Sequence, residues 1–152
     1  MIDILPMTHT HVSQIAQLEK QCFSDPWSEN SISSELSNEL SLWLVAVDEE
    51  EVVGYVGSQS VPPEADVMNL AVSTAYRRQG IAQNLLKELI HRLCEDGITS
   101  LALEVRLSNT AARCLYESFG FVEVGRRPKY YVNPTEDALI MRKELCHADL
   151  IY

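Results

Sequence analysis

Hydrophobic positions along the chain follow two different periods, which together predict a fold that mixes strands and helices. Short apolar runs rich in β-branched residues predict strands, and apolar residues three or four positions apart predict helices. The predicted strands cover residues 2–5, 43–47, 52–58, 66–72, 100–105, 121–125 and 138–142. The predicted helices cover residues 11–23, 28–40, 80–97 and 108–119. The resulting order is β-α-α-β-β-β-α-β-α-β-β, and no linker within it suggests a domain boundary.

The ends of several predicted elements carry the expected residues. Ser28 is expected to cap the second helix, and Ser108 or Asn109 the fourth. Gly97 is typical of the position just after a helix end. The acidic turn at residues 48–51 joins two strands into a hairpin.

Composition and charge favour a globular protein and exclude some classes of partner. The chain has 152 residues, 46% hydrophobic and 22% charged, which suits one domain with a core. No apolar run approaches the length of a membrane span, and the first residues carry no signal-type pattern. The net charge of −10 repels nucleic acid and attracts basic peptides, although acidity for solubility alone also explains it. We therefore expect neither a nucleic acid nor a membrane as partner.

The cysteines and histidines indicate neither a disulfide framework nor a metal site. The four cysteines lie far apart and lack Cys-x-x-Cys spacing: Cys22, Cys94, Cys114 and Cys146. Free thiols in a reducing cytoplasm are the better interpretation. His9 and His11 form a His-x-His pair without an evident third ligand, so we expect no metal.

The connection between residues 72 and 82 is the most informative segment. An apolar strand ending at Val72 leads through Arg77 and Arg78 into an amphipathic helix, with Gly80 and Ala82 at its start. Small residues leave the first N–H groups of the helix open, at the positive end of its dipole, where a pyrophosphate binds well. The Walker tripeptide and the Gly-x-Gly-x-x-Gly fingerprint are both missing. An ordinary strand-to-helix turn is the simpler alternative.

The spacing Arg77-x-x-Gly80-x-Ala82 after a strand resembles the acetyl-CoA loop of the GNAT N-acetyltransferases. The predicted order of elements is also the GNAT topology, so the resemblance covers nearly the whole chain. It implies an α/β (α+β) fold in one domain at residues 1–145, with a mixed, mostly antiparallel central sheet flanked by helices. Residues 146–152 form a tail that matches nothing in this family.

Three further segments resemble the RimI family, the bacterial ribosomal-protein alanine N-acetyltransferases. They are Phe23-x-x-Pro26-Trp27, then Leu103-Glu104-Val105-Arg106 followed by Ser108-Asn109 and Gly120-Phe121, and finally Arg127-x-x-Tyr130-Tyr131 with Glu136-Asp137-Ala138. The first two are more specific than the pyrophosphate loop. The resemblance therefore extends beyond the fold to a substrate class.

This resemblance implies roles for individual residues. Glu104 is expected to act as general base and Tyr116 as general acid. The residues expected to hold acetyl-CoA are Leu70, Ala71, Val72, Arg78, Gln79, Gly80, Ile81, Ala82, Gln83 and Asn109. The residues expected to border the peptide groove are Trp27, Tyr130, Tyr131 and Asp137.

Each of these residues also has a simpler structural interpretation. Strand alternation puts Glu104 on the face of Ala102 and Arg106, which is an ordinary solvated face if nothing covers it. If that face is covered, however, a carboxylate there is unfavourable unless it has a function. Tyr116 could simply be a core residue of its helix, and Asn109 could simply be a helix cap. Tyr130 and Tyr131 could form a surface aromatic cluster, and Asp137 could be an ordinary carboxylate in a turn.

The reaction implied by the resemblance moves an acetyl group from acetyl-CoA to the α-amine of a protein that begins with alanine. The family's acceptor is a small-subunit ribosomal protein whose next residues are basic, which suits the acidic chain. Two alternatives stay open. One keeps the fold and acetylates another amine, on a lysine, a polyamine or a drug. The other is a non-catalytic acyl-CoA sensor, against which the presence of both Glu104 and Tyr116 argues.

Overall fold

The computed structural model describes residues 1–145, and the predicted tail at 146–152 lies outside the described residues. The strands are β1 Ile2–Pro6, β2 Ser41–Asp48, β3 Glu51–Val61, β4 Glu64–Val72, β5 Ser100–Arg106, β6 Val122–Tyr131 and β7 Glu136–Glu144. The helices are α1 Val12–Cys22, α2 Glu29–Ser34, α3 Ile81–Glu95 and α4 Thr110–Ser118. This confirms the predicted order of strands and helices.

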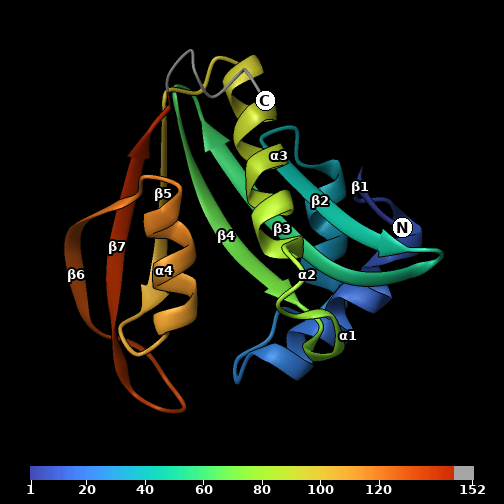
Figure 1. Cartoon of the computed structure of the whole chain (residues 1–152), viewed down its shortest axis with the longest axis horizontal. Coiled ribbons are helices and arrows are strands. Elements are labelled where there is room, and N and C mark those ends of the chain that lie inside the picture. Colours follow the sequence, from blue (N-terminus) through green and yellow to red (C-terminus); the bar gives the residue numbers. More distant parts are fainter. Residues whose placement is uncertain (146–152) are drawn as a thin grey trace.

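A single mixed sheet runs through the described part of the molecule in the order β1-β2-β3-β4-β5-β7-β6. Adjacent strands of this sheet are antiparallel, except β4 and β5, which are parallel. The β4–β5 pairing ends at Val67 opposite Leu103, although β4 continues to Val72 and β5 to Arg106. The two strands therefore diverge towards their carboxyl ends, as Figure 1 shows.

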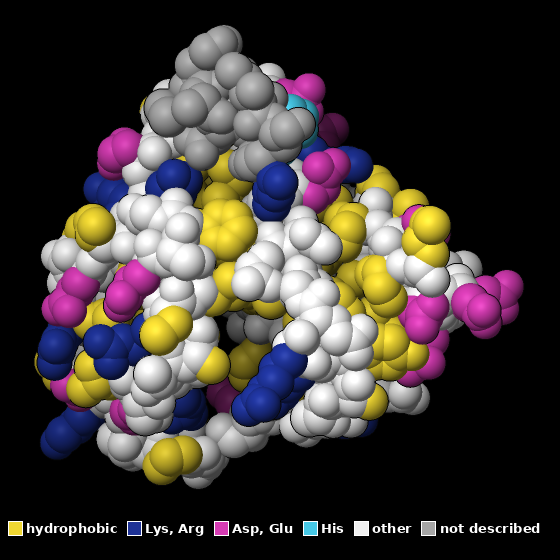
Figure 2. Space-filling model, in the orientation of Figure 1, with side chains coloured by type: hydrophobic (Ala, Val, Ile, Leu, Met, Phe, Trp, Pro, Cys, Tyr) yellow, Lys and Arg dark blue, Asp and Glu magenta, His cyan; other side chains and the backbone are white. Residues whose placement is uncertain are grey.

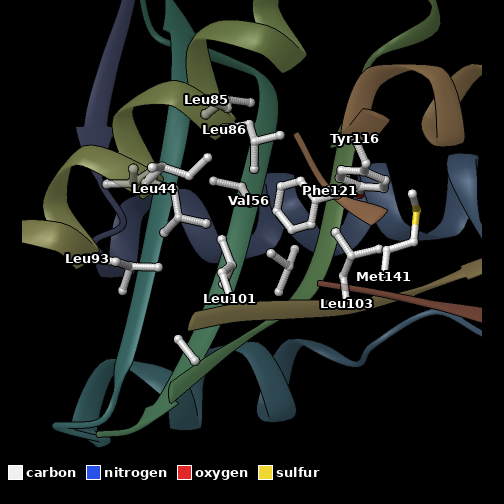
Figure 3. Close-up of a cluster of buried hydrophobic side chains, with 14 of the residues drawn as sticks. Leu44, Val56, Leu85, Leu86, Leu93, Leu101, Leu103, Tyr116, Phe121 and Met141 are labelled. Carbon is white, nitrogen blue, oxygen red and sulfur yellow. The ribbon is translucent and has the colours of Figure 1, made fainter. Parts of the chain in front are cut away.

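Two clusters of buried apolar side chains pack between the sheet and its helices, one on each face. One lies under α3 and α4, and its α3 members form the predicted stripe: Ile81, Leu85, Leu86, Leu89, Ile90 and Leu93. Figure 3 shows part of this cluster around Leu44, Val56 and Leu101. The other cluster packs α1 and α2 against β2 and β3, with Ile15, Ile32 and Tyr55 buried at its centre. Helices thus cover both faces of the β2–β3 part of the sheet (Figure 1).

The second helix is shorter than predicted. It was expected over residues 28–40, but α2 ends at Ser34 and a 3₁₀ turn follows at Glu35–Ser37. Serine hydroxyls compete with the helix for its own carbonyls, since Ser34 donates to Ser31 O at 2.7 Å and Ser37 to Ser34 O at 3.1 Å. The cap itself is confirmed, because the Ser28 hydroxyl accepts the Ser31 N–H.

The sixth strand is longer than predicted. It was expected over residues 121–125, whereas β6 runs to Tyr131 and pairs again with β7 at Glu136 after an irregularity. Pro128 and the charged residues around it interrupt the apolar pattern from which a strand is predicted. Because β6 is the edge of the sheet, it tolerates a proline that a central strand would not.

Candidate active site

The opening between β4 and β5 exposes backbone on one wall. Leu70, Ala71 and Val72 pair with β3, and past Val67 they have no β5 partner. Their free edge is therefore open to a ligand that lies between the two strands. In the space-filling view the molecule is hollowed between the part that carries α4 and the part that carries α3, with an acidic side chain inside the hollow (Figure 2).

The loop after β4 leads directly to the start of α3. Arg77 donates its Nε–H to Val72 O at 3.2 Å, which ties the loop back to the strand it leaves. Arg78 and Gly80 adopt left-handed backbone conformations, with φ of 64° and 79°. Gly80 is the residue before the helix and has no side chain to cap it, so the first N–H groups of α3 stay open. The predicted anion-binding terminus is thus formed, and its ligand stays a prediction.

Glu104 lies on the other wall, on β5. Leu103 and Val105 are buried under α4, while Glu104 faces the opposite side with Ala102 and is partly exposed, as alternation predicted. Arg127 of β6 places its Nε atom 3.0 Å from Glu104 Oε2. That oxygen is shielded from solvent, yet no well-aligned hydrogen bond reaches it. Oε2 therefore keeps a lone pair that no hydrogen bond uses, with the Arg127 guanidinium beside it.

Tyr116 comes from α4, whose first turn is capped by the Asn109 side chain accepting the Ala112 N–H at 3.1 Å. The Tyr116 ring is buried and meets Phe121 edge-on at 5.6 Å (Figure 3). Burial, and secondarily Tyr131, raise the pKa of the Tyr116 phenol. The hydroxyl therefore stays protonated at neutral pH and acts as a hydrogen-bond donor.

Tyr130 and Tyr131 connect the two predicted catalytic residues. Their rings meet edge-on at 5.1 Å at the end of β6. Burial raises the pKa of Tyr131 to about 12, and the nearby Glu104 carboxylate adds to the shift. Burial and Glu104 raise the pKa of Tyr130 in the same way. Tyr131 is thus within electrostatic reach of both Glu104 and Tyr116, and its ring contacts that of Tyr130.

Asp137 and Trp27 take part in contacts within the protein. Asp137 accepts the Lys129 N–H at 2.9 Å, and Lys129 has a left-handed φ of 52°. Asp137 therefore shapes the β6–β7 hairpin, and its role with a peptide stays a prediction. Trp27 is half-buried and meets Trp43 edge-on at 5.4 Å, on the loop between α1 and α2.

Arg106 supports the site but was not predicted to belong to it. It donates to Pro134 O and Val132 O, each at 2.9 Å, and pairs with Glu136 at 3.3 Å. Its guanidinium also lies 4.5 Å from the centre of the Tyr131 ring. Arg106 therefore fixes the hairpin that carries the tyrosines. Its alternation with Glu104 was visible in the sequence, but the carbonyls it binds were not.

Glu19 is a second residue that was not predicted to belong to the site. Its side chain is fully buried in α1 and accepts the Trp27 N–H at 2.8 Å and the Asn69 amide at 2.9 Å. It thus ties the Trp27 loop to β4, one residue before Leu70. The sequence held a signal, because Glu19 lies one turn after Ile15 on the apolar face of its helix.

Metal ions and lipid bilayers are two further classes of possible partner for residues 1–145. Within that range no group of three or more His, Cys, Asp or Glu side chains is arranged to hold a metal ion. No helix in the same range has the length and apolarity needed to cross a bilayer.

Comparison with known proteins gives consistent matches. The family model described as Acetyltransferase (GNAT) family matches residues 12–121. The [ribosomal protein bS18]-alanine N-acetyltransferase of Escherichia coli is 36% identical over 143 residues, covering 93% of this chain and 96% of that protein. The crystal structure of that enzyme has a TM-score of 0.88 at 35% identity, covering 95% of this chain and 94% of that one.

Two other relatives extend this picture. An uncharacterized protein of Mycobacterium leprae is 37% identical over 144 residues, which are 91% of this chain but 39% of that protein, so the chain spans about two fifths of that relative's length. A structure of the NatC complex bound to Gag peptide and CoA matches with a TM-score of 0.85 at 26% identity, covering 95% of this chain and 99% of that one. Since the family match spans most of the described fold and the E. coli enzyme aligns over nearly the whole chain, the protein belongs to the acetyltransferase (GNAT) family.

Proposed function

We propose that this protein transfers the acetyl group of acetyl-CoA to the α-amine of a protein that begins with alanine, namely a small-subunit ribosomal protein. The observation that carries the proposal is the opening between β4 and β5 beside Glu104 and Tyr116, each of which lies within electrostatic reach of Tyr131. The name and substrate of the E. coli relative support the choice of acceptor. The cytoplasm, where ribosomes work, is the matching location.

Acetyl-CoA fits the two open backbone features of the site. The thioester and pantetheine arm would lie along the free edge of Leu70, Ala71 and Val72, and the pyrophosphate at the open N-terminus of α3. The donors there are the N–H groups of residues 78–83. The side-chain oxygen of Asn109 caps α4, the helix that carries Tyr116, and contact of its amide NH₂ group with the cofactor stays a prediction.

Glu104 is proposed to take the proton of the attacking amine. An α-amine has a pKa of about 7.7–8.0, so roughly a tenth is neutral at pH 7, whereas a lysine amine near 10.4 is almost fully charged. The neutral nitrogen attacks the thioester carbonyl, and its extra proton passes to the Glu104 carboxylate, directly or through one water. The tetrahedral intermediate then collapses, which forms the amide and breaks the carbon–sulfur bond.

Tyr116 is proposed to stabilise the departing thiolate. Full proton transfer from an ordinary phenol, with a pKa of about 10, to a thiolate of pKa about 8.5 is already uphill by about 2 kcal/mol. Burial raises the pKa of Tyr116 further, so transfer becomes still less favourable. A hydrogen bond to the developing thiolate, with the proton reaching sulfur late, is therefore the role that its environment favours.

The test of the proposal compares two acceptor peptides of one sequence with acetyl-CoA. The first peptide has a free alanine α-amine followed by basic residues, and the second has that amine blocked and offers a lysine. Turnover of the first peptide alone is the expected result. Turnover of the second alone would keep the acetyltransferase fold and remove the proposed acceptor. CoA binding without turnover of either peptide would favour the sensor alternative.

A further inference from the structure

Arg127 covers the carboxylate of Glu104 from the open side of the sheet. Its Nε atom lies 3.0 Å from Glu104 Oε2, and its guanidinium lies 5.8 Å from the centre of the Tyr130 ring. Its side chain is 58% exposed, against 31% for Glu104. Arg127 is thus the more exposed partner of the pair, and the carboxylate that it contacts belongs to β5, an inner strand of the sheet.

The acceptor brings a cation to the same place. At pH 7 most of an α-amine with a pKa of about 7.7–8.0 arrives as ammonium. A carboxylate attracts that ammonium, but the guanidinium already beside it repels it. An amine that gives its proton directly to Glu104 Oε2 therefore takes the position that Arg127 occupies.

We propose that Arg127 is a placeholder for the acceptor's α-ammonium, which leaves Glu104 when the acceptor binds. The proposal rests on the function proposed above, because it takes Glu104 as the group that meets the acceptor's amine. Arg127 does not take part in acetyl transfer itself. It competes with the acceptor's amine for Glu104, so an acceptor without a cationic amine at its first residue does not displace it.

A second carboxylate is available to Arg127 after it leaves. Asp66 lies on β4 opposite Ala102 of β5, and Ala102 shares its sheet face with Glu104. Burial and Glu64 raise the pKa of Asp66, while Arg142 and Arg127 oppose the rise, so Arg127 is within electrostatic reach of Asp66. The exchange thus moves a guanidinium from one carboxylate towards another. Since exposed ion pairs contribute little, the expected effect on acceptor affinity is only a few-fold.

The test replaces Arg127 by Met in the full chain and measures turnover of the alanine peptide. The expected KM for peptide falls about two- to five-fold, with kcat within two-fold of the unchanged protein. The matched control is Arg126→Met, because Arg126 is the neighbouring arginine and its Nε atom pairs with Glu123 at 3.2 Å, away from Glu104. The control should leave KM unchanged. Arg127→Lys keeps the charge and should stay close to the unchanged protein.

Equilibrium binding of the peptide in the presence of CoA, which cannot react, separates affinity from chemistry. Arg127→Met should tighten peptide binding in this measurement too. The gain should vanish in a Glu104→Gln background, where the guanidinium and the acceptor's ammonium no longer compete for a carboxylate. If the KM of Arg127→Met equals or exceeds that of Arg126→Met, the placeholder role is overturned. The proposed function still stands in that case, provided that the unchanged protein turns over the peptide. If the unchanged protein itself fails to turn over the peptide, both proposals fall.

Discussion

The two halves of the sheet differ in what covers them. In the half with β2 and β3, every residue from Trp43 to Val47 and from Val52 to Ser58 is buried, because α1 and α2 cover one face and α3 the other. In the other half, β5 alternates between buried and partly exposed residues, and β6 is mostly exposed. Only one face of β5 packs against α4.

This difference in coverage suggests that the two halves of the sheet serve different purposes. A strand buried on both faces must be apolar throughout, since each uncompensated polar group there costs free energy. A strand covered on one face can carry Glu104 and Arg106 on the other without that penalty. The first half is therefore expected to set the stability of the fold and the second half its activity. Substitutions in each half test this division.

The largest expected effect is on turnover, from Glu104→Gln. The amide keeps the shape of the side chain but cannot accept the amine's proton, so kcat/KM should fall by about 10²- to 10⁴-fold. CoA binding and Tm should not change, because Glu104 is not part of the apolar core. Glu123→Gln is the matched control, since Glu123 is a more exposed carboxylate whose partner is Arg126. Normal turnover by Glu104→Gln, measured with the alanine peptide, would remove the assigned base.

The next effect is on stability, from Leu44→Ala in the covered half. Leu44 is fully buried beneath α3, and truncating such a side chain costs about 2–5 kcal/mol of unfolding free energy. Urea unfolding measures that loss. Turnover per folded molecule should stay within two-fold, because Leu44 is on β2, which two strands separate from the β5 strand that carries Glu104. A large loss of turnover in fully folded Leu44→Ala protein would contradict the division between the halves.

The sequence predicted the fold well where patterns are long and failed where local chemistry competes. The stripe from Ile81 to Leu93 extends over several turns, so the α3 prediction was confirmed. The second predicted helix is rich in serine, and hydroxyl-to-carbonyl bonds at Ser34 and Ser37 end it early. The second part of β6 was not predicted, because Pro128 argues against a strand unless that strand lies at a sheet edge. Short-range sequence patterns do not reveal which strand lies at an edge.

The positions of the candidate residues on strands and helices could be predicted from the sequence, but their contacts could not. Alternation placed Glu104 on the half-open face, which the structure confirms. The contact of Arg127 with Glu104 depends on strand register, and that of Glu19 with Asn69 joins residues 50 positions apart. A periodic pattern carries no information on either pair. The roles of these residues in binding and catalysis stay predictions until the variants are measured.

A smaller effect is expected where the two halves meet, at the buried Glu19. Its two hydrogen bonds go to different oxygens, so Glu19→Gln presents an NH₂ group either to the Trp27 N–H or to the Asn69 amide. A donor left unpaired in this way costs about 1–3 kcal/mol. We also expect KM for the peptide to rise, because Trp27 is predicted to border the groove. Urea unfolding and peptide KM measure the two effects.

The matched control for Glu19 is the other buried glutamate, Glu35. Its Oε1 alone accepts both the Trp43 Nε1–H and the Gln59 amide, so Glu35→Gln can keep both bonds on the remaining oxygen. Its cost in unfolding free energy should be below about 1 kcal/mol, with KM for the peptide unchanged. Equal losses of stability and equal KM values for both variants would show that Glu19 is an ordinary buried carboxylate.

The last expected effect, on stability, appears only in alkali, from Tyr131→Phe. Burial raises the pKa of Tyr131 from 10.0 to about 12 in the folded protein. As pH rises from about 10 to about 12, the unfolded chain releases this proton while the folded one keeps it, so folding stability falls with pH. The Phe variant lacks this titration, and its stability should fall less steeply over that range. Urea midpoints measured at successive pH values test this, and parallel curves for the two proteins would mean that Tyr131 titrates normally, outside the reach of Glu104.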